Sequence, residues 1–246
     1  MMIIKAFNIV WFLVISLFIA AAIFVTVKFK NNEQKVKDKF MIILGIANII
    51  FFVLYKVWLV FDDFDFVFWK ELPLQLCNIN MFLIIIAAKS KNKFLTVFSS
   101  YVAPLGAIMA MTFAEPGFTD NSIFLLRNIG FYGTHGIILM MGILLFTLGY
   151  QKPSFKDIIY LLPALVVLSF SAYLVNNLFG LIVNYKTNYF FTCSPSGIGL
   201  LEMFWGWIPL EYLYLLPAAP IFILYICGLN GCVSLINLIK SKIKKA

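Results

Sequence analysis

Seven long apolar runs, separated by short polar loops, dominate the sequence. A helix needs about 20 consecutive apolar residues to cross the hydrocarbon core of a bilayer. The runs cover approximately residues 6–27, 40–61, 72–88, 94–113, 128–149, 157–178 and 208–239. They are continuous and do not alternate with period two, which excludes a β-barrel. The chain is also 63% apolar and only 12% charged, which excludes an ordinary soluble domain and a disordered chain. The sequence therefore predicts an all-α polytopic membrane protein, with residues 1–246 forming one seven-helix transmembrane domain.

The basic residues predict the orientation of these helices. Fourteen of the nineteen Lys and Arg residues lie in the first, third and fifth loops or in the C-terminal tail, and four lie on the opposite side. Basic residues in short loops stay in the cytoplasm. We therefore expect the C-terminus in the cytoplasm and the N-terminus outside, in a multi-pass protein of a cell membrane, the bacterial plasma membrane. Most of the basic residues behind the net charge of +8 lie in these cytoplasmic loops, where they set the orientation. We therefore expect no nucleic-acid partner.

Three parts of the chain allow alternatives to seven regular spans. The first run follows Lys5 like a signal peptide, but it continues through Val27 into a lysine-rich loop, which favours a retained helix. The segment 179–206 is rich in aromatic residues, which favours the membrane interface. The last run would be about 48 Å long as one helix, so a kink is predicted at Pro217 and Pro220.

A cysteine and a histidine fall at the same predicted depth in the membrane. Cys77 in the third run and His135 in the fifth each lie about 10 Å below the outer boundary, counting 1.5 Å per residue. His135 is the only histidine of the chain. An imidazole beside a thiol is the minimal nucleophile and base pair, because the imidazole accepts the thiol proton and the thiolate attacks. We expect Cys77 and His135 to be catalytic.

Other polar residues of this layer are candidate substrate-binding groups. Lys56, close to the outer end of the second run, would favour a thiolate electrostatically, and Asn80 is placed to donate to an oxyanion. Tyr132 lies three residues before His135 and is expected to orient its ring, while Asn78 is a weaker candidate. Glu211 is a candidate partner for Lys56 or His135.

Each of these residues also has a purely structural interpretation. Cys77 can be a small buried hydrophobe or form a disulfide with Cys193. His135 can be an interhelical hydrogen-bond donor, and Lys56 can extend to the headgroups. Glu211 can be a carboxylate at headgroup level. With one histidine and no CxxC motif, we expect no metal site and no cofactor.

Several short motifs resemble the YwaF-type integral membrane family, which includes the eukaryotic transmembrane protein 164. They are residues 72–78 (LPLQLCN), 187–191 (TNYFF) and 205–209 (WGWIP). The resemblance implies a seven-helix fold and coenzyme-A-independent acyl transfer between phospholipids through an essential cysteine, which corresponds to Cys77. It also adds Asn188 and Tyr189 to the expected substrate-binding residues.

The sequence thus favours a membrane acyltransferase, or lipid acyl hydrolase, whose partners are phospholipids and lysophospholipids. Two other classes remain open. A transporter or its binding subunit would use the same polar layer as a substrate pocket, although the sequence has no internal repeat of the kind many transporters show. A purely structural membrane protein would use no ligand.

Overall fold

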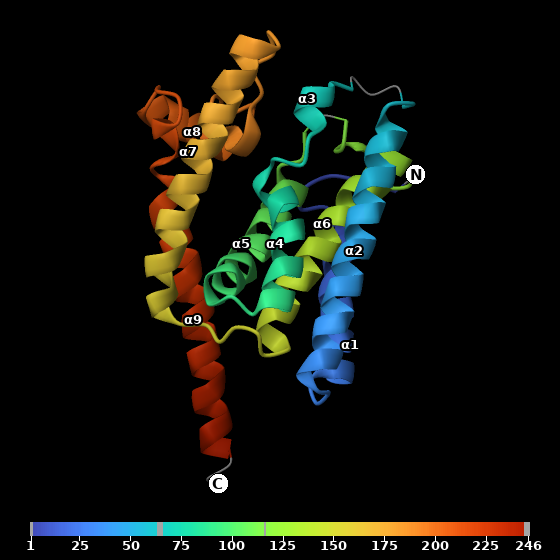
Figure 1. Ribbon diagram of the computed structural model, residues 1–246, viewed down its shortest axis with the longest axis vertical. Coiled ribbons are helices and arrows are strands. Elements are labelled where there is room, and N and C mark those ends of the chain that lie inside the picture. Colours follow the sequence, from blue (N-terminus) through green and yellow to red (C-terminus); the bar gives the residue numbers. More distant parts are fainter. Residues whose placement is uncertain (1, 63–65, 116, 244–246) are drawn as a thin grey trace. The chain divides into compact units, whose positions relative to one another are not determined.

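The computed structural model describes residues 2–62, 66–115 and 117–243 and forms two compact units, Met1–Gln151 and Lys152–Ala246 (Figure 1). It is an all-α polytopic membrane protein, as predicted. Within the described residues, six helical stretches are long and apolar enough to cross a membrane: Ile9–Phe29, Gln34–Leu59, Lys93–Thr112, Leu126–Thr147, Phe155–Ile182 and Leu213–Leu235. A seventh apolar helix, Leu76–Ser90, has 15 residues and is about 22 Å long at 1.5 Å per residue.

The described part of the first unit contains six helices and one strand pair. In chain order its elements are β1 (Ile3–Ile4), α1 (Ile9–Phe29), α2 (Gln34–Leu59), α3 (Phe68–Glu71), α4 (Leu76–Ser90), α5 (Lys93–Thr112), β2 (Asn121–Ser122) and α6 (Leu126–Thr147). The strands pair antiparallel, with Ile3 opposite Ser122, and join the N-terminal segment to the loop before α6.

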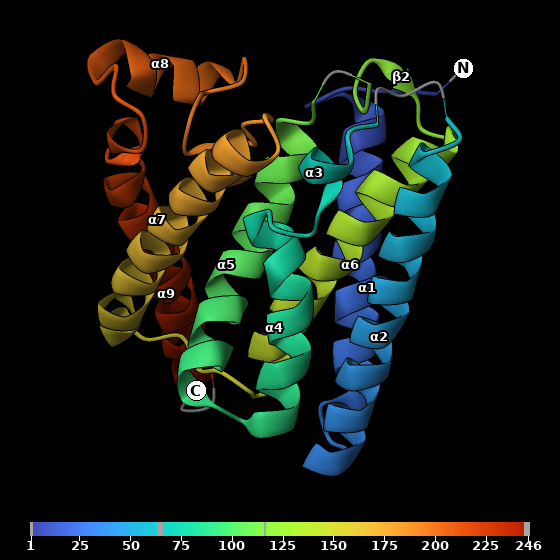
Figure 2. The ribbon, with the colours of Figure 1, turned by 45° about the horizontal axis from the view of Figure 1, so that its top comes forward.

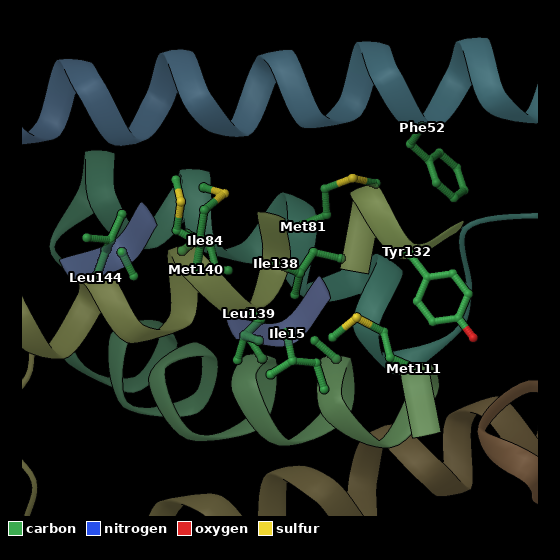
Figure 3. Close-up of a cluster of buried hydrophobic side chains, with 14 of the residues drawn as sticks. Ile15, Phe52, Met81, Ile84, Met111, Tyr132, Ile138, Leu139, Met140 and Leu144 are labelled. Atoms are coloured by element: carbon green, nitrogen blue, oxygen red, sulfur yellow. The ribbon is translucent and has the colours of Figure 1, made fainter. Parts of the chain in front are cut away.

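Helix α6 lies at the centre of the first unit and contacts α1, α2, α4 and α5. The core side chains come from α6 and from these four neighbouring helices (Figure 3), and include Ile15, Phe52, Met81, Ile84, Met111, Ile138, Leu139 and Leu144. By contrast, α1 and α2 expose many large apolar side chains, which suits contact with lipid chains rather than water.

Pro73 determines where α4 begins. A residue that precedes proline is disfavoured in the helical region, because the proline ring clashes with its backbone. Leu72 is accordingly extended, with φ −60° and ψ 147°, and the helix starts only at Leu76. The predicted span over 72–88 therefore begins four residues later, which makes Cys77 the second residue of a helix.

Glycines on α6 let aromatic side chains of other helices approach its backbone closely. A Cβ atom at Gly130 would lie 2.2 Å from Cδ2 of Tyr55, and one at Gly136 would lie 2.1 Å from the ring of Phe18. Small residues commonly permit such contacts between membrane helices. Gly130 and Gly136 therefore serve helix packing in the first unit.

Replacing Gly130 by alanine is expected to lower the free energy of unfolding by about 1–3 kcal/mol, because overpacking a dense core forces backbone shifts. The new methyl group would lie 2.7 Å from Cβ of Tyr55, which cannot yield unless α2 moves. Gly106→Ala is the matched control, since a Cβ atom there meets no described atom within 4 Å. Thermal unfolding in detergent measures both variants, and equal unfolding temperatures would contradict the prediction.

The second unit contains three helices and three short 3₁₀ turns. Helix α8 lies across the end of the unit at which α7 ends and α9 begins (Figure 2). In chain order the elements are η1 (Phe155–Asp157), α7 (Ile158–Ile182), η2 (Tyr189–Phe191), α8 (Gly199–Trp207), η3 (Leu213–Leu215) and α9 (Ala218–Ile243).

The last helix begins ten residues later than the predicted start at 208. Tyr212 has a positive φ of 63°, a left-handed conformation that a helix interior does not contain. Pro217 directly precedes α9, and Pro220 lies in its first turn, where a missing N–H costs no helical hydrogen bond. The prolines therefore mark the start of α9 and do not kink a longer helix.

Asn176 on α7 holds the following segment in place. Its side-chain amide donates to the carbonyl of Tyr189 at 3.0 Å and to the hydroxyl of Thr192 at 2.8 Å. Its oxygen accepts hydrogen bonds from the Thr187 hydroxyl and from the Tyr189 backbone N–H. Because Asn176 is fully buried and these groups pair with one another, the aromatic segment after α7 is an ordered part of the unit.

Candidate active site

The first turn of α4 and the middle of α6 bring Cys77 and His135 together. The distance from Cys77 Sγ to His135 Nε2 is 3.3 Å, within the limit for a hydrogen bond to sulfur. His135 is 7% exposed, and Cys77 is partly exposed. The predicted meeting of the two side chains is confirmed, and a thiol proton at this distance can pass directly to the imidazole.

The backbone of α6 fixes the tautomer of His135. Nδ1 lies 2.8 Å from the carbonyl oxygen of Phe131, one turn earlier in the helix. A carbonyl oxygen can only accept, so Nδ1 carries the proton of the neutral ring and donates it. Nε2 is therefore the acceptor that faces the Cys77 S–H. This is the protonation state that a general base for a thiol requires.

Phe131, and not Tyr132, orients the histidine ring. The Phe131 and His135 ring centroids are 4.4 Å apart, in addition to the hydrogen bond to the Phe131 carbonyl. The Tyr132 hydroxyl is buried and has no hydrogen-bond partner among the described residues. The role predicted for Tyr132 is therefore filled by the residue beside it, through a helical hydrogen bond that side-chain spacing did not indicate.

The N-terminus of α4 places backbone donors near the thiol, because Cys77 is the second residue of the helix. The first N–H groups of a helix have no partner inside it and carry the positive end of the helix dipole. The backbone N–H groups of Cys77 and Asn78 belong to this first turn. Such groups favour negative charge at the sulfur and at an oxygen atom held beside it.

The Asn80 side chain uses one of its two N–H donors within its own helix. It donates to the carbonyl of Leu76 at 3.0 Å, and the residue is fully buried. Its oxygen, like that of Asn78, has no partner among the described residues. An amide nitrogen carries two N–H groups, so the role predicted for Asn80 at an oxyanion stays a prediction, and the backbone N–H groups of α4 are further candidate donors.

Lys56 lies near the pair but has an acidic partner of its own. Its ammonium forms an ion pair with Glu71 of α3 and lies 5.3 Å and 4.8 Å from the ring centroids of Phe52 and Tyr55. Lys56 is therefore held by an acidic partner and two aromatic rings, and does not extend alone to the headgroups.

Glu211 pairs with Lys186 and not with the predicted partners Lys56 or His135. Both carboxylate oxygens accept hydrogen bonds from the Lys186 ammonium, at 2.6 Å and 2.8 Å. These hydrogen bonds raise the pKa of Lys186 above its ordinary value. The expectation failed because sequence spacing does not indicate which of several cations a carboxylate meets.

Asn188 and Tyr189 have structural roles in the second unit. The Asn188 side chain donates to the Ser194 carbonyl at 2.8 Å and accepts from the backbone N–H of Cys193 at 3.0 Å. Tyr189 is 1% exposed and is held by Asn176. These contacts explain why the chain uses such residues here. Their binding to substrate remains a prediction.

The four cysteines are free thiols, so the alternative disulfide between Cys77 and Cys193 is not formed. Cys193 is 8% exposed, and its burial raises the pKa of its thiol. It therefore carries less thiolate at neutral pH than an ordinary cysteine. Cys193 lies outside the spans and lacks a paired histidine, so only Cys77 has a base at hydrogen-bonding distance.

Two polar residues of the first unit were not singled out by the sequence, Glu71 beside Lys56 and Asn48 on α2. Glu71 looked like a loop carboxylate, and only the fold of the segment before α4 brings it to Lys56. Asn48 is fully buried on the face of α2 that also carries Phe52 and Tyr55, and neither of its side-chain polar atoms has a partner among the described residues. An asparagine within an otherwise apolar run was the available signal for it.

The fold and the site define a class: polytopic α-helical membrane proteins with a cysteine and histidine pair at a helix N-terminus. Residues 2–62, 66–115 and 117–243 contain no cluster of three or more His, Cys, Asp or Glu side chains that could hold a metal ion. The model of the TMEM164 family matches residues 3–241, and the chain belongs to this family. No curated protein and no solved structure matches the chain. The YwaF label remains a prediction.

Proposed function

We propose that the protein is a coenzyme-A-independent phospholipid acyltransferase that carries the acyl group on Cys77. The observation that carries the proposal is the 3.3 Å contact between the thiol and Nε2 of His135, with the tautomer set by the Phe131 carbonyl. The resemblance of residues 72–78 to a family with an essential cysteine supports the same residue. The exposed apolar side chains of α1 and α2 suit contact with lipid, the source of the proposed substrate.

The first half of the reaction forms a thioester. His135 Nε2 takes the thiol proton, and the thiolate attacks the ester carbonyl of a donor phospholipid. The backbone N–H groups at the start of α4 stabilise the oxyanion. When the intermediate collapses, the carbon–oxygen bond of the ester breaks, and the lysophospholipid leaves with the proton from His135.

The second half transfers the acyl group to an acceptor. His135 takes a proton from the hydroxyl of a lysophospholipid, whose oxygen attacks the thioester, and the released thiolate recovers the proton. No outside energy is needed, because one ester is exchanged for another through a thioester. Water in place of the acceptor hydroxyl would give a free fatty acid, which is the hydrolase outcome.

The test is to trap the acyl group on the purified protein. The protein, in nanodiscs with a phospholipid labelled in its acyl chain, is expected to gain the acyl mass on the peptide that contains Cys77. Hydroxylamine should remove this mass, as it does from a thioester. Added lysophospholipid should discharge the adduct into a new phospholipid. Absence of any adduct on wild-type protein, with lipid turnover intact, would refute the thioester mechanism.

A further inference from the structure

The ion pair between Lys56 and Glu71 is unusual for its surroundings. The side chains are 20% and 10% exposed, whereas the second ion pair of α3, between Lys70 and Glu115, is 39% and 37% exposed. Removing two charges from water costs free energy that their mutual attraction does not reliably recover. The pair is therefore not explained by stability alone.

The position of Lys56 indicates what its charge is for. The ammonium lies 5.3 Å and 4.8 Å from the ring centroids of Phe52 and Tyr55. The Tyr55 ring in turn lies against Gly130 of α6, five residues before His135. In a glycerophospholipid, the acyl esters and the phosphate are attached to the same three-carbon glycerol. A lipid whose ester reaches Cys77 therefore brings a phosphate anion within reach of a nearby cation.

We propose that Lys56 binds the phosphate of the donor glycerophospholipid. In the absence of lipid, Glu71 forms the ion pair with Lys56, and the phosphate replaces it. This inference rests on the proposed acyl transfer and names the group by which that site selects its substrate. An ammonium pairs with a phosphate oxygen through a charge-assisted hydrogen bond. Glu71 is an internal competitor with the same charge sign as the phosphate.

Helix α3 remains attached when Glu71 is displaced. Lys70 is the neighbour of Glu71 and pairs with Glu115 at 2.6 Å, so this contact holds α3 to the segment after α5. The exchange of one anion for another at Lys56 requires the Glu71 side chain to move and leaves the segment anchored. Glu71 lies six residues before Cys77, so the competitor and the nucleophile belong to one short stretch of chain.

The experiment compares two donors with the same acyl chains, a phospholipid and a neutral diacylglycerol, in the same nanodiscs. The rate at which each donor acylates Cys77 is measured against donor concentration. Lys56→Gln is expected to raise the KM for the phospholipid by about tenfold to a hundredfold, the range for losing a hydrogen bond to a charged group. Its KM for diacylglycerol should stay unchanged.

Removing the competitor should have the opposite effect. Glu71→Gln is expected to lower the KM for the phospholipid and leave the KM for diacylglycerol unchanged. Glu115→Gln is the matched control, because it removes the other ion pair of α3 and leaves Lys56 and Glu71 in place. Any loss of anchoring should change the KM for both donors alike, whereas loss of the competitor changes only the KM for the phospholipid. The charge exchange Lys56→Glu with Glu71→Lys keeps an ion pair at this place. A structural role predicts full recovery in this double variant, whereas phosphate binding predicts a phospholipid KM that stays raised.

Glycerol 3-phosphate distinguishes a lipid headgroup from a soluble phosphate as the ligand. Competition with the phospholipid, lost in Lys56→Gln, would show that the site takes phosphate from either source, and its absence would restrict the site to lipid. Equal KM changes for both donors in Lys56→Gln would overturn the inference. If wild-type protein forms no adduct, the proposed acyl transfer is refuted, and phosphate binding is tested separately.

That test uses Cys77→Ala protein and measures, by native mass spectrometry, how much phospholipid and diacylglycerol it retains. Preferential retention of phospholipid that is lost on adding Lys56→Gln supports phosphate binding, and equal retention with and without Lys56→Gln contradicts it.

Discussion

Cys77→Ala protein is expected to lose lipid acyl transfer by at least about a thousandfold, because removing a covalent nucleophile closes the two-step route. The acyl adduct should disappear with the activity. Transfer of a labelled acyl chain from phospholipid to lysophospholipid, measured in nanodiscs, gives the rate. The fold should persist, since Cys77 lies at the start of α4 and its partly exposed side chain is only slightly larger than alanine.

Cys232→Ala is the matched control for this substitution. Cys232 is an exposed cysteine of α9, and its replacement should leave both adduct and transfer unchanged. Undiminished transfer in Cys77→Ala protein would contradict the nucleophile assignment. A transporter that uses the same polar layer would keep its function in Cys77→Ala protein, so the same variant separates the two classes.

His135→Gln protein is expected to acylate Cys77 about a hundredfold to ten-thousandfold more slowly, the usual range for losing a general base. Glutamine can still hydrogen-bond, but its amide does not accept a proton at neutral pH. The thiol then reacts without a base at 3.3 Å. Acylation is followed by the mass of the Cys77 peptide in single-turnover experiments.

Thr134→Ala provides the control for a change in the same turn of α6. The Thr134 hydroxyl is buried and has no partner among the described residues, so its removal should leave the acylation rate within about twofold, since no hydrogen bond is lost. A second measurement makes the assignment sharper. In Cys77→Ala protein, His135→Gln should have no further effect on lipid turnover, because groups that act as one unit are not additive. A further loss would show that His135 acts elsewhere.

Main-chain groups supply most of the polar surroundings of the Cys77 and His135 pair. The Phe131 carbonyl accepts from His135 and fixes its tautomer, and the N–H groups of Cys77 and Asn78 belong to the first turn of α4. Main-chain groups at helix ends and turns are held by the fold and lose no rotamer entropy when they bind an anion. A membrane site with few polar side chains can therefore still stabilise a developing charge.

The sequence by itself determined the class of protein and the pairing of Cys77 with His135. In lipid every backbone polar group needs a partner, which leaves helices and closed barrels. Continuous apolar runs of 17 or more residues, without period-two alternation, therefore indicate helices. Helix rise is constant, so counting residues from the loops placed the two side chains at one depth. Both conclusions rest on quantities that are counted along the chain, namely the length of each apolar run and the number of residues from its end to the side chain.

Only the tertiary structure decided which polar groups face which. The rotation of α4 after Pro73 directs one side-chain N–H of Asn80 to Leu76. The fold of the segment before α4 brings Glu71 to Lys56, and the fold of the second unit brings Lys186 to Glu211. These outcomes depend on the rotation of each helix about its axis and on the course of loops, which packing fixes and residue spacing does not. The sequence predicts the depth of a side chain along its helix. The direction in which the side chain points around the helix axis depends on how the helices pack.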